Sequence, residues 1–132
     1  MRIYITHCSA KKNDDFKNSN MEVFPDELYA SKRIRAFMNR CKEKMVEWAI
    51  FSDLYGIWFS EEKHSWYDKS PDSVTEEEYN SLLLNFDQRL LHYNEIWFYH
   101  NPGRFHPLYK QIIKDSALKN KIHLFTHKEE IV

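Results

Sequence analysis

The segment richest in reactive side chains lies near the N-terminus. His7, Cys8 and Ser9 directly follow a short apolar run, and Lys11 and Lys12 come soon after. A thiol beside cations can have a lowered pKa and act as a nucleophile, and a partly desolvated lysine can attack an electrophilic carbon as the neutral amine. We therefore expect Cys8 and Lys12 as catalytic candidates, and His7, Ser9 and Lys11 as ligand-binding residues. The alternative is that Cys8 is a small buried core residue and that both lysines are solvated.

A second polar segment surrounds an Asn-Pro-Gly turn later in the chain. Asn101, Arg104 and His106 suit the recognition of a phosphate or a base edge. His100 is the candidate general acid or base. The two histidines could also bind a metal together with Cys8, but their spacing matches no standard ligand motif. We therefore expect no metal and no cofactor.

An aromatic-rich stretch, residues 52–73, offers rings that could stack on a nucleobase. The stretch is long for a structureless connection, and connections of that length are usually functional or mobile. The alternative is a hydrophobic flap that closes over the edge of a sheet. An acidic side chain here could bind a ribose hydroxyl or an exocyclic amine, or cap the next turn. The ligand-binding candidates in the stretch are Ser52, Tyr55, Gly56, Trp66, Tyr67 and Asp68.

Strands and helices alternate along the chain in the predicted secondary structure. Apolar runs predict strands at residues 2–7, 47–51, 96–99 and 122–125, and amphipathic spacing predicts helices at 25–45, 75–90 and 107–118. Strands that are apolar throughout favour a parallel sheet covered on both faces. The expected fold is a three-layer α/β sandwich with a mainly parallel central sheet of about four strands. Ligands bind beyond the carboxyl ends of such strands, so the candidate residues should converge on one edge.

Composition limits the class of protein. The chain has 132 residues, 42% hydrophobic and 16% aromatic, which predicts one folded domain over residues 1–132 rather than a disordered chain. Two glycines are too few for a Walker loop or a dinucleotide-binding turn, which excludes kinases, GTPases and classical dehydrogenases. Cys8 and Cys41 are expected to be reduced thiols. No apolar run or leader pattern indicates a membrane span or secretion, so we expect a cytoplasmic protein.

The formal net charge of −1 hides an uneven distribution. The middle third of the chain is acidic, whereas the segment between Ser31 and Lys44 is strongly basic. A helix that carries Lys32, Arg33 and Arg35 on its surface could contact the phosphates of RNA or DNA. The alternative is an ordinary solvated helix face.

Four motifs resemble a group of small, uncharacterised domains. The motifs are ITHCSAKK at residues 5–12, DELYASKR at 26–33, WAIFSDLYG at 48–56 and WYDK at 66–69. The group is marked by a Cys-Ser-x-x-Lys turn, a Leu-Tyr-x-Ser helix start and a Ser-x-x-Tyr-Gly strand exit. The likeness covers about the first 70 residues, and the remainder shares only the order of elements.

A more distant resemblance is to archaeosine synthase, which acts on a 7-deazaguanine base in transfer RNA. The pattern is similar in Cys8 and Ser9, a following lysine, and Tyr29 with Ser31, but the chain lacks a Lys-Pro-Tyr run. The resemblance implies a uracil-DNA-glycosylase-like fold. It also implies Lys12 or Lys11 as a reactive amine, Cys8 and Ser9 beside a base, and Tyr29 and Ser31 as ligand-binding residues.

Two functions follow as hypotheses. The first is an enzyme that acts on a nucleobase, nucleoside or nucleotide, free or within transfer RNA or another nucleic acid, as a base-modifying transferase or an N-glycosidic-bond enzyme. The second is a non-catalytic nucleotide- or RNA-binding module of the same fold. A third possibility is a structural partner protein whose aromatic stretch is an interface.

Overall fold

The protein is built around a mixed five-stranded sheet. The computed structural model describes residues 1–132. The strands run in the order β4-β3-β1-β6-β7, and they are β1 (Arg2–His7), β3 (Trp48–Ser52), β4 (Gly56–Phe59), β6 (Glu95–Tyr99) and β7 (Ile122–Phe125). β1 pairs in parallel with β3 and β6, and β6 pairs in parallel with β7, whereas β3 and β4 are antiparallel. The prediction of a mainly parallel sheet of about four strands is therefore corrected to a mixed sheet of five.

The additional strand arises from a tight hairpin directly after β3. Gly56 has a φ of 75°, in the left-handed region that favours glycine. The following amide of Ile57 donates to Asn85 Oδ1 at 2.8 Å, and a Cβ added at Gly56 would overlap the Asn85 side chain. Gly56 thus allows the hairpin to approach a helix closely, which gives this residue a structural role.

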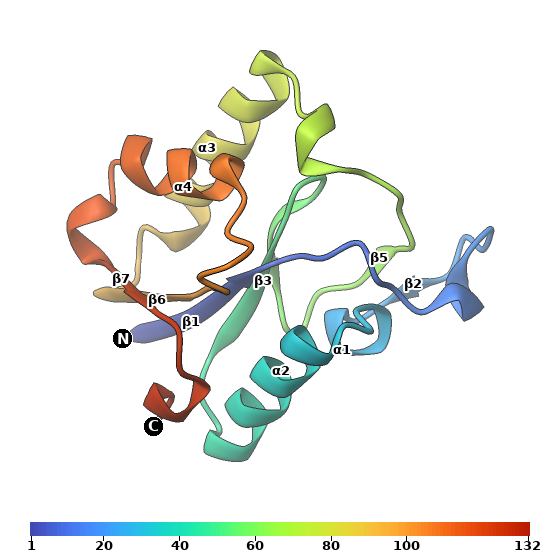
Figure 1. Ribbon diagram of the computed structural model, residues 1–132, viewed down its shortest axis with the longest axis horizontal. Helices are drawn as coiled ribbons and strands as arrows, with labels where there is room; N and C mark the ends of the chain where they lie inside the picture. Colours follow the sequence, from blue (N-terminus) through green and yellow to red (C-terminus); the bar gives the residue numbers. More distant parts are fainter.

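Helices cover both faces of the sheet. Figure 1 shows α1 (Pro25–Leu28) and α2 (Lys32–Lys44) on one face, and α3 (Glu76–Leu90) and α4 (Pro107–Asp115) on the other. A small antiparallel pair, β2 (Glu22–Val23) and β5 (His64–Ser65), lies beyond the main sheet. Short 3₁₀ turns occupy η1 (Asp14–Phe16), η2 (Pro71–Ser73), η3 (Lys119–Lys121) and η4 (Lys128–Glu130). None of the helices has the length and apolar composition that crossing a bilayer requires.

The helix predicted over residues 25–45 is divided in two. The chain leaves α1 at Tyr29, and Ser31 then caps α2 by accepting the amide of Ile34 at 3.3 Å. Because serine accepts a free amide of the first turn, it starts a new helix more readily than it continues one. The capping box predicted for the next helix is confirmed: Thr75 Oγ1 accepts from the Glu78 amide, and Glu78 Oε1 accepts from the Thr75 amide.

Aromatic contacts fix the helices to the sheet. Phe37 of α2 stacks on Tyr99 with ring centroids 5.7 Å apart, and Phe86 of α3 contacts Phe51 at 5.3 Å. Phe37, Phe51 and Phe86 belong to one cluster of 30 buried apolar residues, and Tyr99 packs against it. Tyr109 of α4 also contacts Phe51, with ring centroids 5.6 Å apart, so α3 and α4 pack on the same strand.

The connections reverse direction beside β1. The chain passes from β1 through α2 to β3 on one side, and it later returns to pair β6 on the other side of β1. The carboxyl ends of β1 and β6 therefore flank a topological switch point, where open α/β sheets form their ligand crevices.

Candidate functional site

A cavity of about 590 Å³ lies at this edge of the sheet. The segments that follow β1, β3 and β6 meet there, together with the first turns of α2 and α4. The lining residues are His7, Cys8, Ser9, Ala10, Ser31, Lys32, Arg33, Asp53, Asp68, Lys69, Ser70, Pro71, Asn101, Arg104, His106 and Tyr109. The segment after β7 does not join the cavity, since Thr126 and His127 line a neighbouring groove.

His7 is held as a neutral imidazole in the cavity wall. Its ring lies between the rings of Phe105 and Tyr109, at centroid distances of 5.8 and 5.0 Å, and the residue is only 6% exposed. Burial, with the charge of Arg33, lowers the pKa of His7 to about 4. Nδ1 lies 3.1 Å from the carbonyl oxygen of Cys8, which can only accept, and 3.4 Å from the Arg33 guanidinium, which can only donate. The shorter contact, with the carbonyl oxygen, favours the tautomer that carries the proton on Nδ1. Nε2 is then a buried acceptor, and it has no partner.

Asp53 is a buried acidic residue of the same cavity wall. The residue is 2% exposed, and its Oδ1 is buried without a hydrogen-bond partner. Burial raises the pKa of Asp53, while the thiol of Cys8 and the positive charges of Lys12 and Lys69 oppose that rise. A buried carboxylate oxygen without a donor is costly in free energy, and this cost would be offset by a ligand that brings an N–H or O–H group.

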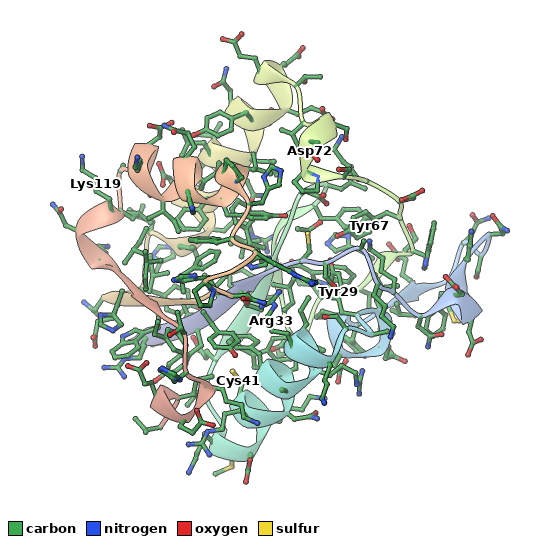
Figure 2. The ribbon with its side chains drawn as sticks, viewed as in Figure 1. Tyr29, Arg33, Cys41, Tyr67, Asp72 and Lys119 are labelled. Carbon is green, nitrogen blue, oxygen red and sulfur yellow. The ribbon has the colours of Figure 1, made fainter.

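Arg33 places a positive charge at another wall of the cavity. Its guanidinium donates to Thr6 Oγ1 at 2.6 Å and to the carbonyl oxygen of His7 at 3.0 Å, but it has no carboxylate partner. Burial lowers its pKa. Figure 2 shows the side chain extending from α2 toward the middle of the sheet. A half-buried cation without a counter-ion favours an anion in the cavity.

Two helix N-termini add to this positive potential. Ser31 caps α2 and His106 caps α4, and both capping residues line the cavity. Free amides and the helix dipole make such termini favourable for anions. His106 Nδ1 accepts the amide of Leu108 at 3.0 Å, and its Nε2 donates to Asp72 Oδ1 at 2.6 Å. His106 therefore positions α4 against η2 in addition to lining the cavity.

Cys8 lines the cavity as a protonated thiol. Its Sγ lies 3.2 Å from the hydroxyl of Tyr109 and accepts the amide of Asp53 at 3.4 Å. Burial, and next the negative charge of Asp53, raise the pKa of Cys8 to about 11. A thiol with that pKa carries very little thiolate at neutral pH, so this environment favours a role in shaping the cavity. Ser9 lies beside it, and its buried hydroxyl has no partner.

Neither lysine of the first segment lines the cavity. Lys12 is 9% exposed, and its Nζ lies 4.3 Å from the centre of the Tyr67 ring. Lys11 is exposed. His100 also lies outside the cavity lining, where its ring stacks on Phe105 at 4.4 Å and supports the ring on which His7 packs. Burial lowers the pKa of His100.

Most of the predicted aromatic residues pack next to the cavity without lining it. Tyr29 and Tyr67 share a hydrogen bond of 2.6 Å, and Ser52 donates to the Tyr67 hydroxyl at 3.0 Å. Figure 2 shows Tyr29 and Tyr67 side by side near the carboxyl edge of the sheet. Tyr55 stacks on His64 at 4.0 Å. These rings pack on one another, and Tyr29, Tyr55 and Tyr67 do not line the cavity.

Of the remaining predicted ligand-binding residues, three line the cavity and Trp66 does not. Trp66 is half-buried beneath the Lys17 ammonium, which lies 5.5 Å from the centre of its ring, and it does not line the cavity. Asp68, Asn101 and Arg104 do line it. Asn101 also forms its own turn, because its Oδ1 accepts the amide of Gly103 at 3.0 Å.

The basic face of α2 is largely engaged within the fold. Arg35 donates to the carbonyl oxygens of Asp26 and Tyr29, Arg40 donates to those of Ile131 and Glu129, and Lys42 pairs with Asp26. Lys32 is exposed and makes no ion pair. Of the three cations predicted to contact nucleic acid, Arg35 is engaged within the fold, whereas Lys32 and Arg33 line the cavity.

Several residues that line the cavity were not among the candidates predicted from the sequence. Asp53 directly follows a buried strand at the carboxyl edge, so the rule that identified His7 and Asn101 could have found it. Lys69 and Tyr109 carried no such signal. Tyr109 has the spacing of an inward-facing helical residue, and only its position on α4 places it beside Cys8.

Comparisons of the chain with protein-family models, curated proteins and solved structures return no match. The resemblance to a uracil-DNA-glycosylase-like domain therefore stays a prediction.

Proposed function

We propose that the protein is an enzyme that acts on a nucleotide bound in the cavity. The phosphate would lie toward Arg33 and Lys32, and the nucleoside part toward Asp53 and His7. The observation that carries this proposal is that one cavity contains both a guanidinium without a counter-ion and a carboxylate oxygen without a donor.

The positive charges around the cavity favour a ligand that carries a phosphate. Lys32 and Arg104 add two exposed cations to Arg33, and two helix N-termini face the same space. Arginine forks and helix N-termini are the groups that proteins use most to bind phosphate. A volume of about 590 Å³ lies within the usual size of a small-molecule site.

Two unpaired hydrogen-bond acceptors in the cavity wall favour a ligand that carries a nucleoside. Asp53 Oδ1 and His7 Nε2 lack donors, and both belong to residues of the cavity wall. Ribose hydroxyls and the N–H groups of a base supply such donors. A simple inorganic anion would leave both acceptors unpaired, so a ligand with an anionic end and a donor-bearing end fits better.

The shifted pKa values of Asp53 and His7 favour an enzyme over a module that only binds. Asp53 has a raised pKa and His7 a lowered one, and groups shifted in this way within a cleft are typical of active sites. Asp53 can accept a proton from a nucleophile or stabilise positive charge at a sugar carbon. These abilities suit modification of a base or cleavage of an N-glycosidic bond, the two reaction types that the sequence predicts.

A non-catalytic nucleotide-binding module is the second candidate. Two observations favour it: the thiol of Cys8 is protonated at neutral pH, and Lys12 packs on Tyr67 outside the cavity lining. Cys8 is therefore not activated as a nucleophile, and Lys12 is not placed beside a ligand in the cavity. Binding without any product would support this candidate.

The test is a panel of nucleobases, nucleosides and nucleotides. Binding is measured by thermal shift and calorimetry, and turnover by chromatography of the products. We expect nucleotides to bind more tightly than the matching nucleosides. We expect Asp53→Asn to weaken nucleotide binding about ten- to a hundredfold, because it removes a charged acceptor worth about 1.5–3 kcal/mol.

Asp14→Asn is the matched control, since Asp14 is exposed on η1 and does not line the cavity. Equal binding of nucleosides and nucleotides, or equal effects of the two substitutions, would overturn the proposed site. We also propose a cytoplasmic location, because Cys8 and Cys41 are both free thiols.

A further inference from the structure

A groove of about 510 Å³ adjoins the cavity along the first turn of α2. Lys32 and Arg33 line both the cavity and the groove. The groove continues past Thr126 and His127 to Lys128 at the start of η4. The cations that would hold a phosphate therefore lie at the junction of two hollows.

The chemistry of the groove differs from that of the cavity. His127 and Lys128 are exposed, and Lys128 makes no ion pair. Glu129 is the only carboxylate in its lining, and the ring of Tyr99 stacks on Phe37 and contacts Phe125 at a tilt. The groove thus offers cations for a phosphate backbone, but no buried acceptor comparable to Asp53 for reading a base.

We propose that the cavity and the groove together bind two successive nucleotides of a single-stranded nucleic acid. One nucleotide occupies the cavity, the phosphate between the two lies at Lys32 and Arg33, and the phosphate of the second nucleotide lies near Lys128. The inference rests on the proposed function of the cavity.

The expected contact is short and insensitive to sequence. Arg35, Arg40 and Lys42 are engaged within the fold, so α2 provides no longer basic track. One additional phosphate contact steepens the dependence of log affinity on log salt by about 0.7 for single strands. The second base should have little effect on affinity, since the groove has no buried acceptor that could read it.

The experiment compares 5′-phosphorylated mononucleotides with 5′-phosphorylated dinucleotides for each of the four common ribonucleotides. Affinities are measured by calorimetry at low and at physiological salt. We expect the dinucleotides to bind about fivefold or more tightly than the mononucleotides, with the steeper salt dependence. Lys128→Glu should remove this gain and leave mononucleotide affinity little changed.

Lys44→Glu is the matched control, because it changes the net charge equally but lies at the opposite end of α2. Equal affinities of mono- and dinucleotides, or equal effects of the two substitutions, would overturn the inference while leaving mononucleotide binding intact. Tighter binding of a 5′–5′ pyrophosphate-linked dinucleotide than of the strand dinucleotide would also overturn it, in favour of a free dinucleotide. Failure of every mononucleotide and dinucleotide to bind would overturn the proposed function and this inference together.

Discussion

The buried imidazole of His7 makes the stability of the protein depend on pH. Burial, with the charge of Arg33, lowers the folded-state pKa to about 4, whereas the ordinary value is 6.5. The unfolded chain therefore takes up a proton at a pH at which the folded chain does not, so stability is lost as the pH falls from about 6.5 toward 4. At about 1.4 kcal/mol per pKa unit, His7 alone accounts for a loss of about 3 kcal/mol, of which about 2 kcal/mol is lost by pH 5.

Urea unfolding at pH 7, 6 and 5 measures this loss in the wild-type protein and in His7→Asn. Asparagine does not titrate, and its amide can donate to the carbonyl oxygen of Cys8 as Nδ1 does. We expect the difference in unfolding free energy between the two proteins to change by about 2 kcal/mol from pH 7 to pH 5. His123→Asn, at an exposed histidine, is the control and should change the profile little. Identical pH profiles for wild type and His7→Asn would refute the assignment of a neutral buried His7.

Further predictions test other parts of the account. Because the pKa of Cys8 is about 11, iodoacetamide at pH 7.5 should alkylate it about a hundredfold more slowly in the folded protein than in the unfolded chain, by mass spectrometry; comparable rates would contradict a buried protonated thiol. Gly56→Ala should destabilise the protein by about 1–3 kcal/mol in urea unfolding, since it combines a positive φ with an overlap on Asn85. Gly103→Ala, whose added Cβ meets only one atom at 3.6 Å, should cost far less, and similar losses would argue against the close approach. Arg35→Gln should lower the melting temperature without changing nucleotide affinity, whereas Lys32→Gln should do the reverse; the opposite pattern would contradict the assignment of these two cations.

Local signals in the sequence determined much of the fold. The apolar runs predicted β1 and β7 with the bounds that the structure has, and Thr75 with Glu78 marked the start of α3. The hairpin of β3 and β4 was missed because β4 is only four residues long and lies within the aromatic-rich stretch that was interpreted as a connection. The division between α1 and α2 was missed because the apolar spacing continues through the cap at Ser31.

The candidate site was predictable in its position more than in its composition. The rule that ligands bind at the carboxyl edge of the sheet predicted a shared position for His7, Cys8 and Asn101, and all three line the cavity. Lys12 packs on Tyr67, and Tyr55 stacks on His64. These contacts depend on how the connecting segments fold over one another, which the apolar pattern of the sequence does not show. The protonation states of His7 and Cys8 likewise depend on their burial in the fold, because desolvation is the main cause of both pKa shifts.

The most direct test of the account is a crystal structure of the protein with the nucleotide that raises its melting temperature most. We expect a phosphate within about 4 Å of the Arg33 guanidinium, and an N–H or O–H group of the nucleoside within about 3 Å of Asp53 Oδ1. A nucleotide bound elsewhere on the protein, with Arg33 and Asp53 both unpaired, would contradict it.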